Sequence, residues 1–210
     1  MVPASSPRLQ DPLAYERRFW SRGVLRIAGV DEVGRGPLAG PVLAGAVILR
    51  PGEAVPGAVD SKQLSPEERE ELNEQILRRA QAVAVGAASA REIDRLNILR
   101  ATALAISRAL ARLPARPDHV ILDGLPLLQL DWEHEAQVDG DCLIHSVACA
   151  SIVAKVCRDR LMRRLAERYP GYGWHTNVGY ATEEHREALR RLGPTPHHRL
   201  TFGAQLDLGL

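Results

Sequence analysis

Short apolar segments separated by turn residues constrain the fold of this chain more than any other feature. Residues 24–31 (VLRIAGVD) and 41–49 (PVLAGAVIL) have the length and apolar content of buried strands, and a glycine-rich turn joins them. Residues 81–89, 119–123 and 135–139 are three more strand-like segments, and the later ones alternate with helical segments. This order predicts an α/β fold with a mixed sheet of about five strands and helices on both faces.

Two capping boxes mark helix starts between these strands. The sequence S-P-E-E, with proline at the first helical position, predicts a helix over residues 65–79. The sequence S-A-R-E predicts one long helix over residues 89–113. Further helices are expected over residues 13–20, 144–167 and 182–192.

The length and composition fit one principal domain. The 210 residues are 45% hydrophobic, which is enough for one sizeable core. We expect residues 1–20 to form an N-terminal arm with a short helix, and residues 21–205 to form one α/β domain with a short tail to 210. No segment has the apolar length of a signal peptide or a membrane span, so we expect a cytoplasmic protein with no membrane association. Nothing in the sequence demands more than a monomer.

Net charge and cysteine spacing exclude several classes. The net charge of +1 does not by itself indicate a nucleic-acid partner. The three cysteines, Cys142, Cys149 and Cys157, form no C-x-x-C pair and are odd in number. Neither a disulfide framework nor a zinc site follows from them, and we expect three reduced thiols in or near a helix.

Acidic residues follow several predicted strands. Asp31 and Glu32 follow the first strand, Asp123 ends the fourth, and Asp141 follows the fifth. Carboxylates from neighbouring strand ends would converge and repel one another, and Mg²⁺ or Mn²⁺ would relieve that repulsion. Each acid alone is also an ordinary turn former, but four together favour a metal site. Two such ions about 4 Å apart can support phosphodiester hydrolysis.

A glycine-rich turn, Gly34-Arg35-Gly36, joins the first two strands. It superficially matches a dinucleotide fingerprint, but Pro37 interrupts it and a strand follows where that fingerprint requires a helix. There is no G-K-S/T, so the turn is not a P-loop. The glycines permit close approach of a ligand, with Arg35 available for a phosphate or ribose. The alternative is a plain tight turn between strands.

Several segments, in order, resemble the bacterial ribonuclease HII family. They are GVDEVGRGPLAGPV, DSKQLSP, ILDG, ASIVAKVCRDRLM, YPGYGW followed by GYATEEH, and GPTPHHRLTF. The resemblance extends from about Ile27 to Phe202 and implies a ribonuclease H-like catalytic domain. It also implies four metal-binding catalytic carboxylates, which fall on Asp31, Glu32, Asp123 and Asp141, and two divalent ions, Mg²⁺ or Mn²⁺.

The resemblance further implies a substrate-binding set. The backbone of Gly34, Arg35 and Gly36 would read the ribose 2′-OH, the group that distinguishes RNA from DNA. Tyr180 would stack on the sugar at the RNA–DNA junction, and Lys62 would meet phosphate. The alternatives are a core aromatic for Tyr180 and a solvated loop charge for Lys62.

Three residues of the long C-terminal helix would support the site. They are Ser151, Arg158 and Asp159, with Asp159 acting behind the carboxylates. An ion pair on the helix surface is the alternative for Arg158 and Asp159. His198-Arg199 also match a family segment. These two residues could equally pack the tail or bind the substrate.

The sequence departs from the family pattern at Asp139, Asn177 and Val178, where positive residues are usual. The carboxylates are intact, so the departures bear on affinity, salt dependence and metal preference, and not on the chemistry. His175 and Arg186 are candidates for compensation.

The implied activity is hydrolysis of the RNA strand in RNA–DNA hybrids and a nick 5′ to single ribonucleotides in duplex DNA, leaving 3′-hydroxyl and 5′-phosphate ends. Two other classes of protein are less consistent with the sequence: a dehydrogenase would need a helix after the glycine turn, and a non-catalytic binding module would not need four acids. The metal preference, the preferred substrate length and any sliding-clamp partner are not readable from the sequence.

Overall fold

A five-stranded sheet forms the centre of the structure, a computed structural model that describes residues 11–203. The strands are β1 (Ile27–Val33), β2 (Val42–Ile48), β3 (Ala82–Ala88), β4 (His119–Asp123) and β5 (Glu135–Gln137). They lie in the order β3-β2-β1-β4-β5, with β1, β2 and β3 antiparallel and with β4 and β5 parallel to β1. The predicted mixed sheet is confirmed.

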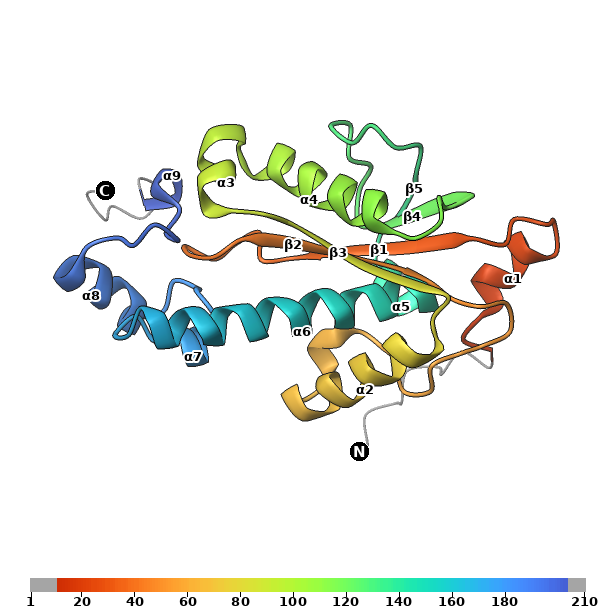
Figure 1. Ribbon diagram of the computed structural model, residues 1–210, viewed down its shortest axis with the longest axis horizontal. Coiled ribbons are helices and arrows are strands. Elements are labelled where there is room, and N and C mark those ends of the chain that lie inside the picture. Colours follow the sequence, from red (N-terminus) through yellow and green to blue (C-terminus); the bar gives the residue numbers. More distant parts are fainter. Residues whose placement is uncertain (1–10, 204–210) are drawn as a thin grey trace, which may run out of the picture.

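Helices cover both faces of this sheet (Figure 1). On one face lie α3 (Ala90–Leu96) and α4 (Ile98–Arg112), and on the other lie α2 (Pro66–Arg79) and the long α6 (His145–Arg168). Both predicted capping boxes are present, at Ser65 with Glu68 and at Ser89 with Glu92. Because each box satisfies backbone N–H groups at a helix start, local sequence sets where α2 and α3 begin.

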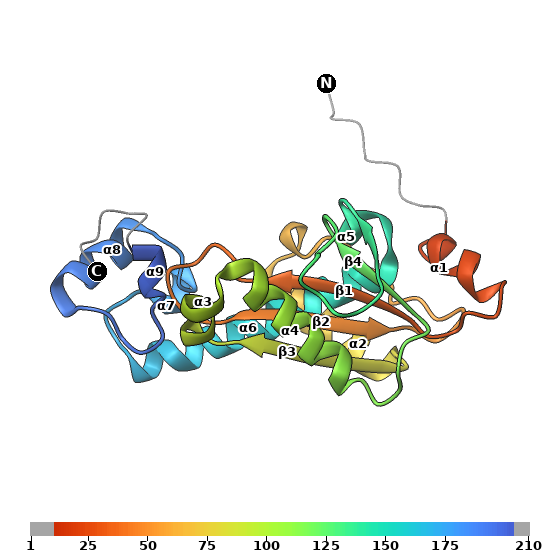
Figure 2. The ribbon, with the colours of Figure 1, turned by 90° about the horizontal axis from the view of Figure 1, so that it is seen from above.

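The shorter helices lie beyond the sheet and at its edges. Figure 2 shows α1 (Ala14–Trp20) at one end of the molecule and α7 (Trp174–Asn177), α8 (Glu183–Leu192) and α9 (Leu200–Gly203) at the other. The short elements η1 (Ser61–Gln63) and α5 (Gly140–Leu143) complete the fold. The predicted helices over 13–20, 144–167 and 182–192 match α1, α6 and α8 within about one residue.

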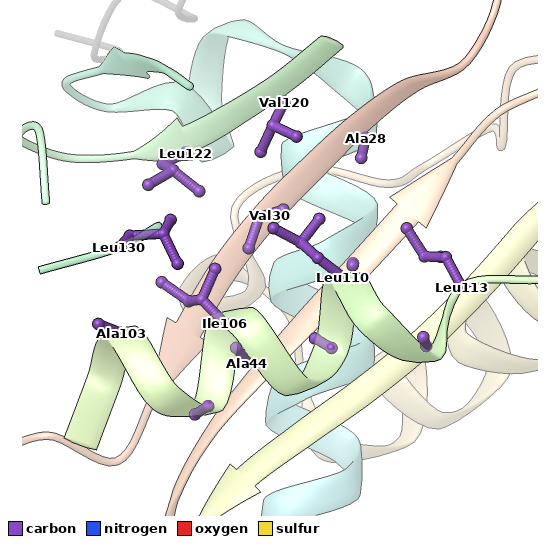
Figure 3. Packing of buried hydrophobic residues seen from close by; sticks show 14 of the residues in the cluster. Ala28, Val30, Ala44, Ala103, Ile106, Leu110, Leu113, Val120, Leu122 and Leu130 are labelled. Carbon is purple, nitrogen blue, oxygen red and sulfur yellow. The ribbon is translucent and has the colours of Figure 1, made fainter. Parts of the chain in front are cut away.

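The largest apolar cluster lies between the sheet and α4 (Figure 3). Val30 and Ala28 of β1 face Ile106 and Leu110 of α4 within this cluster. Alternate residues of a strand point to opposite faces, so the residues between them point to the α6 side. This alternation decides which side chains of β1 reach the functional site.

Helix α6 lies directly against glycines of the central strands. A Cβ added at Gly45 of β2 would lie 2.5 Å from the carbonyl oxygen of Ala150, and one at Gly29 of β1 would collide with the backbone of Ser146. Glycine at these positions therefore allows the helix backbone to approach the sheet closely. The close approach brings the side chains of α6 within reach of β1.

The structure corrects three of the predicted element boundaries. The single helix expected over 89–113 is two helices, because Asn97 adopts φ +69° and its side chain accepts a hydrogen bond from the N–H of Arg100, which caps α4. The first strand ends at Val33 and not at Asp31, so Asp31 and Glu32 lie inside β1. The fifth strand has only three residues, and Asp141 lies in α5.

The predicted N-terminal arm and C-terminal tail lie at the edges of the described range. The predicted arm and tail fall largely on residues 1–10 and 204–210, which lie outside it. Within residues 11–203 no helix has the length and apolar character needed to cross a membrane. All three cysteines are free: Cys142 is exposed, Cys149 is buried and Cys157 is partly buried.

Candidate active site

Asp31 and Glu32 come from the central strand β1 but point to opposite faces of the sheet. Alternation places Asp31 on the α6 face with Gly29, and Glu32 on the other face with Val30. Asp31 is buried, and its carboxylate accepts a hydrogen bond from the N–H of Glu32 at 2.7 Å. The adjacent pair therefore contributes one acid to each side of the strand.

Asp123 and Asp141 complete an acidic cluster on the α6 face. β4 runs parallel to β1, and Val30 pairs with Leu122, which brings Asp123 beside Asp31 at the same end of the sheet. The chain leaves β5, turns at Asp139 with φ +55°, and enters α5, where Asp141 is buried. The N–H of Gly140 donates to Asp123 at 2.7 Å, which fixes α5 against the end of β4.

The three aspartates converge closely. One carboxylate oxygen from each of Asp31, Asp123 and Asp141 lies within 4.8 Å of the other two. Burial, and next the charge of Glu32, raise the pKa of Asp31 to about 8. Burial, and next the charge of Asp141, raise the pKa of Asp123. Three acids in this space repel one another when ionised, and a bound cation would relieve that repulsion.

This donor set suits a hard divalent cation. Carboxylate oxygens are the ligands that Mg²⁺ and Mn²⁺ prefer, and Asp31, Asp123 and Asp141 offer at least one each from three different elements. Glu32 lies outside the group of three and pairs with Arg35 at 3.2 Å, although its charge still acts on Asp31. The four predicted acids therefore divide into a cluster of three and a neighbour.

Lys62 and two serines surround the cluster. Lys62, on η1, places its Nζ 3.4 Å from a carboxylate oxygen of Asp141, and its side chain is largely exposed. Ser61, also on η1, shares a hydrogen bond of 2.9 Å with Ser151 of α6. A hydrogen bond from Ser151 to Asp31 favours the ionised acid and partly offsets the burial that raises the pKa of Asp31. The predicted Lys62 and Ser151 thus lie at the cluster.

The Gly34-Arg35-Gly36 turn follows β1 directly. Gly34 has φ +88°, a conformation that glycine adopts without strain, and an added Cβ there would collide with the buried side chain of Arg158. Because β2 follows this turn, the dehydrogenase alternative is excluded. The Arg35 side chain is about half exposed, with Glu32 as its ion-pair partner.

Tyr180 lies beside this turn and is 45% exposed, so it is not a core aromatic. A Cβ added at Gly36 would lie 3.8 Å from the Tyr180 ring. Asn177, one of the departures from the family pattern, is buried and holds the preceding loop: it donates to the carbonyl of Tyr172 and accepts from the N–H of Gly179. The structure therefore explains Asn177 by folding of this loop.

The supporting residues of α6 have unequal positions. Arg158 is fully buried and donates to the carbonyls of Pro41 and Ala39 in the connection between β1 and β2. The alternative of an ion pair with Asp159 on the helix surface is therefore wrong for Arg158. Asp159 pairs instead with Lys155 at 2.8 Å. Arg158 thus supports the glycine turn, whereas the expected action of Asp159 behind the carboxylates stays a prediction.

His198 and Arg199, for which the sequence allows either packing of the tail or substrate binding, are both buried. Arg199 donates to the carbonyls of Gly34 and Arg35, and His198 lies 3.0 Å from the buried His185. The only sequence signal for them is their place in GPTPHHRLTF, because neither has a local pattern that predicts its contacts. The two residues that could replace the missing positive charge differ in their surroundings. His175 is exposed, whereas Arg186 pairs with Glu183 at 3.5 Å.

Solved structures share this architecture. The ribonuclease H2 of Pyrococcus horikoshii OT3 matches with a TM-score of 0.74 and 27% identity, over 88% of this chain and 97% of that chain. Bst-RNase HIII in complex with Mn²⁺ matches with a TM-score of 0.71 and 22% identity, over 98% of this chain and 76% of that one. The fold and the acidic cluster define a metal-dependent phosphodiester hydrolase with the ribonuclease H-like fold.

Sequence comparison narrows this class to one family. The family model described as Ribonuclease HII matches residues 28–205. The ribonuclease HII of Synechococcus sp. (strain JA-3-3Ab) is 54% identical over 203 residues, which cover 95% of this chain and 91% of the relative. The chain belongs to the ribonuclease HII family, which confirms the resemblance drawn from its motifs.

Proposed function

We propose that this protein is an endonuclease that hydrolyses the RNA strand of RNA–DNA hybrids and nicks duplex DNA 5′ to a single embedded ribonucleotide, leaving 3′-hydroxyl and 5′-phosphate ends. The observation that carries the proposal is the convergence of Asp31, Asp123 and Asp141 within 4.8 Å, in a chain of the ribonuclease HII family. The catalytic domain would comprise residues 21–205, working as a monomer in the cytoplasm.

The carboxylates would hold the metal. Asp31, Asp123 and Asp141 form the group, with Glu32 adjoining it, and we propose that together they hold two Mg²⁺ or Mn²⁺ ions. Bound divalent cations supply activation of a water molecule and neutralisation of charge on the departing oxygen. Bst-RNase HIII has been solved with Mn²⁺.

The surrounding residues would place the substrate. Lys62 is exposed and close to Asp141, so its ammonium group can turn to a phosphate once the acids are neutralised by metal. The backbone of Gly34, Arg35 and Gly36 would contact the ribose 2′-OH, and the exposed Tyr180 ring beside it would stack on the adjoining sugar. The Tyr180 ring lies 3.8 Å from where a Cβ on Gly36 would stand, and this closeness supports one surface that reads an RNA–DNA junction.

The test uses duplex DNA that carries one ribonucleotide, incubated with the protein and Mg²⁺ or Mn²⁺. We expect a single nick immediately 5′ to the ribonucleotide, abolished by EDTA. Asp123→Asn should lower the rate by more than the roughly 10–100-fold loss typical of a residue that only supports a metal ligand. Asp118→Asn is the matched control, because Asp118 pairs with Arg26 just before β4, outside the acidic cluster.

The outcomes separate the parts of this proposal. A nick that persists in EDTA would contradict the proposal that cleavage requires bound divalent ions. Cleavage of a long hybrid without a nick at the single ribonucleotide would keep the nuclease and remove the junction-reading role of the turn and Tyr180. If the wild type cleaves neither substrate, and the Asp31→Asn variant binds both substrates as well as the wild type does, the protein is a binding module and not a nuclease.

A further inference from the structure

The tail that follows α8 folds back onto the connection between β1 and β2. His198 forms a β-bridge with Ala39, and the N–H of Arg199 donates to the carbonyl of Leu38 at 2.8 Å. His198 and Arg199 are 3% and 1% exposed. Two polar residues that are adjacent in sequence are therefore buried together beside the glycine turn, where burial is costly unless their hydrogen bonds are satisfied.

Arg199 satisfies its guanidinium group on backbone carbonyls. It donates to Gly34 at 2.6 Å, to Arg35 at 2.8 Å and to Gly40 at 3.0 Å. Burial, and next the charge of Arg158, lower the pKa of Arg199 to about 9. The planar fork of an arginine can reach three carbonyls at once, which a lysine ammonium on a flexible chain does not reproduce.

The carbonyls of the turn are thereby fixed inward. Within residues 11–203, the backbone N–H groups of Arg35 and Gly36 donate no hydrogen bond to the protein. A turn whose carbonyls are held on one side presents its free N–H groups on the other, already oriented for an acceptor. Such preorganisation lowers the conformational entropy that the turn loses when a substrate binds.

His198 supports Tyr180 through a second histidine. The N–H of Thr195 donates to Nδ1 of His198, so Nε2 of His198 carries the proton and donates to Nε2 of His185 at 3.0 Å. Nε2 of His185 also accepts from the indole N–H of Trp174. Nδ1 of His185 then donates to the carbonyl of Tyr180 at 2.8 Å. This chain of neutral groups fixes the backbone at Tyr180.

We propose that His198 and Arg199 are positioning residues that hold the Gly34–Gly36 turn and Tyr180 as one surface for a ribonucleotide joined to DNA. Arg199 acts through the carbonyls of the turn, and His198 acts through His185 and the carbonyl of Tyr180. This inference rests on the proposed function, because it assumes that the turn and Tyr180 contact the junction. Neither residue would touch the reacting atoms.

The test compares ribose recognition with general duplex binding. We would measure KM and kcat for a duplex with one ribonucleotide, and Ki for the same duplex made only of DNA as a competitor. Arg199→Lys and His198→Asn should each lower the ratio of Ki to KM by about tenfold, the size of effect expected when one hydrogen-bonded contact of about 1.4 kcal/mol is lost. The Ki for all-DNA duplex should change little.

Two further variants separate positioning from stability. Asp94→Ala removes the carboxylate that accepts from the N–H groups of Leu200 and Thr201, so it loosens the same tail without touching the turn. Asp94→Ala should lower the melting temperature and leave the ratio of Ki to KM unchanged. His198→Gln keeps a donor near the position of Nε2 and should restore most of the ratio that His198→Asn loses. If Arg199→Lys fails to fold, the two His198 variants still decide the matter.

The contrary results are distinct. An unchanged ratio in both Arg199→Lys and His198→Asn, or an equal loss in Asp94→Ala, would overturn the positioning role. A wild-type protein with no preference for the ribonucleotide duplex would instead remove the proposed function, and this inference would fall with it.

Discussion

Asp31 lies where burial and charge both oppose its ionised form. It is buried on the α6 face of β1, with Asp123 and Asp141 close by, and its pKa is raised to about 8 by burial first and by Glu32 second. The metal-free fold therefore tolerates an unfavourable residue at its centre. Such a cost at one position is typical of a site selected for function and not for stability.

Asp31→Asn should therefore stabilise the metal-free protein. The unfolded aspartate ionises near pH 3.8, whereas the folded one keeps its proton to about pH 8, so the stability of the wild type falls as the pH rises through this interval. In EDTA at pH 9 the variant should gain roughly 1–3 kcal/mol in the free energy of unfolding. Thermal melts with and without Mn²⁺ check this: Mn²⁺ should raise the wild-type melting temperature and leave that of the variant nearly unchanged. A less stable variant in EDTA would contradict the argument.

At the scale of single elements, helix α6 and the loops around it connect the carboxylates to the fold. Its Ser151 reaches Asp31, and its Arg158 reaches the connection that carries the glycine turn. The spacing between α6 and the sheet depends on Gly29 and Gly45, where no side chain fits. The geometry of the site is thus tied to one helix–sheet distance.

Gly45→Ala tests this distance. The new methyl group would lie 2.5 Å from the carbonyl of Ala150, so α6 must move outward or the strand must shift. We expect a loss of about 1–3 kcal/mol in stability, as for overpacked cores, together with a lower rate of nicking. Denaturant unfolding and the single-ribonucleotide assay measure the two effects. Wild-type stability in this variant would show that α6 can move freely.

Asn97 ends α3 and begins α4 in a conformation that glycine prefers, with φ +69° and ψ 166°. Asn97→Ala would lose the cap on Arg100 and keep the backbone strain, so we expect it to cost about 1–2 kcal/mol. Asn97→Gly would lose the cap but relieve the strain, and it should cost less than half as much. Chemical denaturation of both variants measures the order, and an alanine variant more stable than the glycine variant would contradict it.

At the scale of the whole molecule, two sets of buried groups give opposite pH dependences. Asp31, Glu32 and Asp123 have raised pKa values, with burial as the first cause, and these three acids destabilise the fold as the pH rises. The buried histidines have lowered pKa values for the same first cause: burial and His185 lower that of His198 to about 3. A histidine kept neutral in the fold stabilises above the unfolded pKa and loses this contribution as the pH falls.

The difference between wild type and His198→Gln isolates the histidine contribution. Below about pH 6.5, where an unfolded histidine gains its proton, the wild type should lose stability faster than the variant. The gap should widen down to about pH 3, the pKa of the folded His198. Denaturant unfolding at pH 7, 5.5 and 4.5 measures both proteins. Parallel curves would mean that His198 accepts a proton in the folded state without cost.

The local sequence was sufficient for the sheet strands, for most of the longer helices and for the family. Ser65 and Ser89 specify helix starts through contacts three residues away. Short apolar segments separated by turn residues specify the strands. The motifs around Asp31 and Ser151 placed the chain in the ribonuclease HII family and selected the four acids. Asn97 escaped prediction, because a single residue with positive φ leaves the apolar pattern of a helix nearly unbroken.

The tertiary structure alone decided how these residues meet. Strand register and alternation place Asp31 with Asp123 and turn Glu32 to the other face, while α5 delivers Asp141. Arg199 contacts Gly34, which lies 165 residues away in the sequence, and His198 forms a β-bridge with the similarly distant Ala39 of the connection between β1 and β2. Propensities and motifs act over a few residues, whereas these contacts exist only once the sheet and α6 have packed. The sequence by itself therefore determined most of the elements, the family and the choice of candidate acids, and packing determined the geometry.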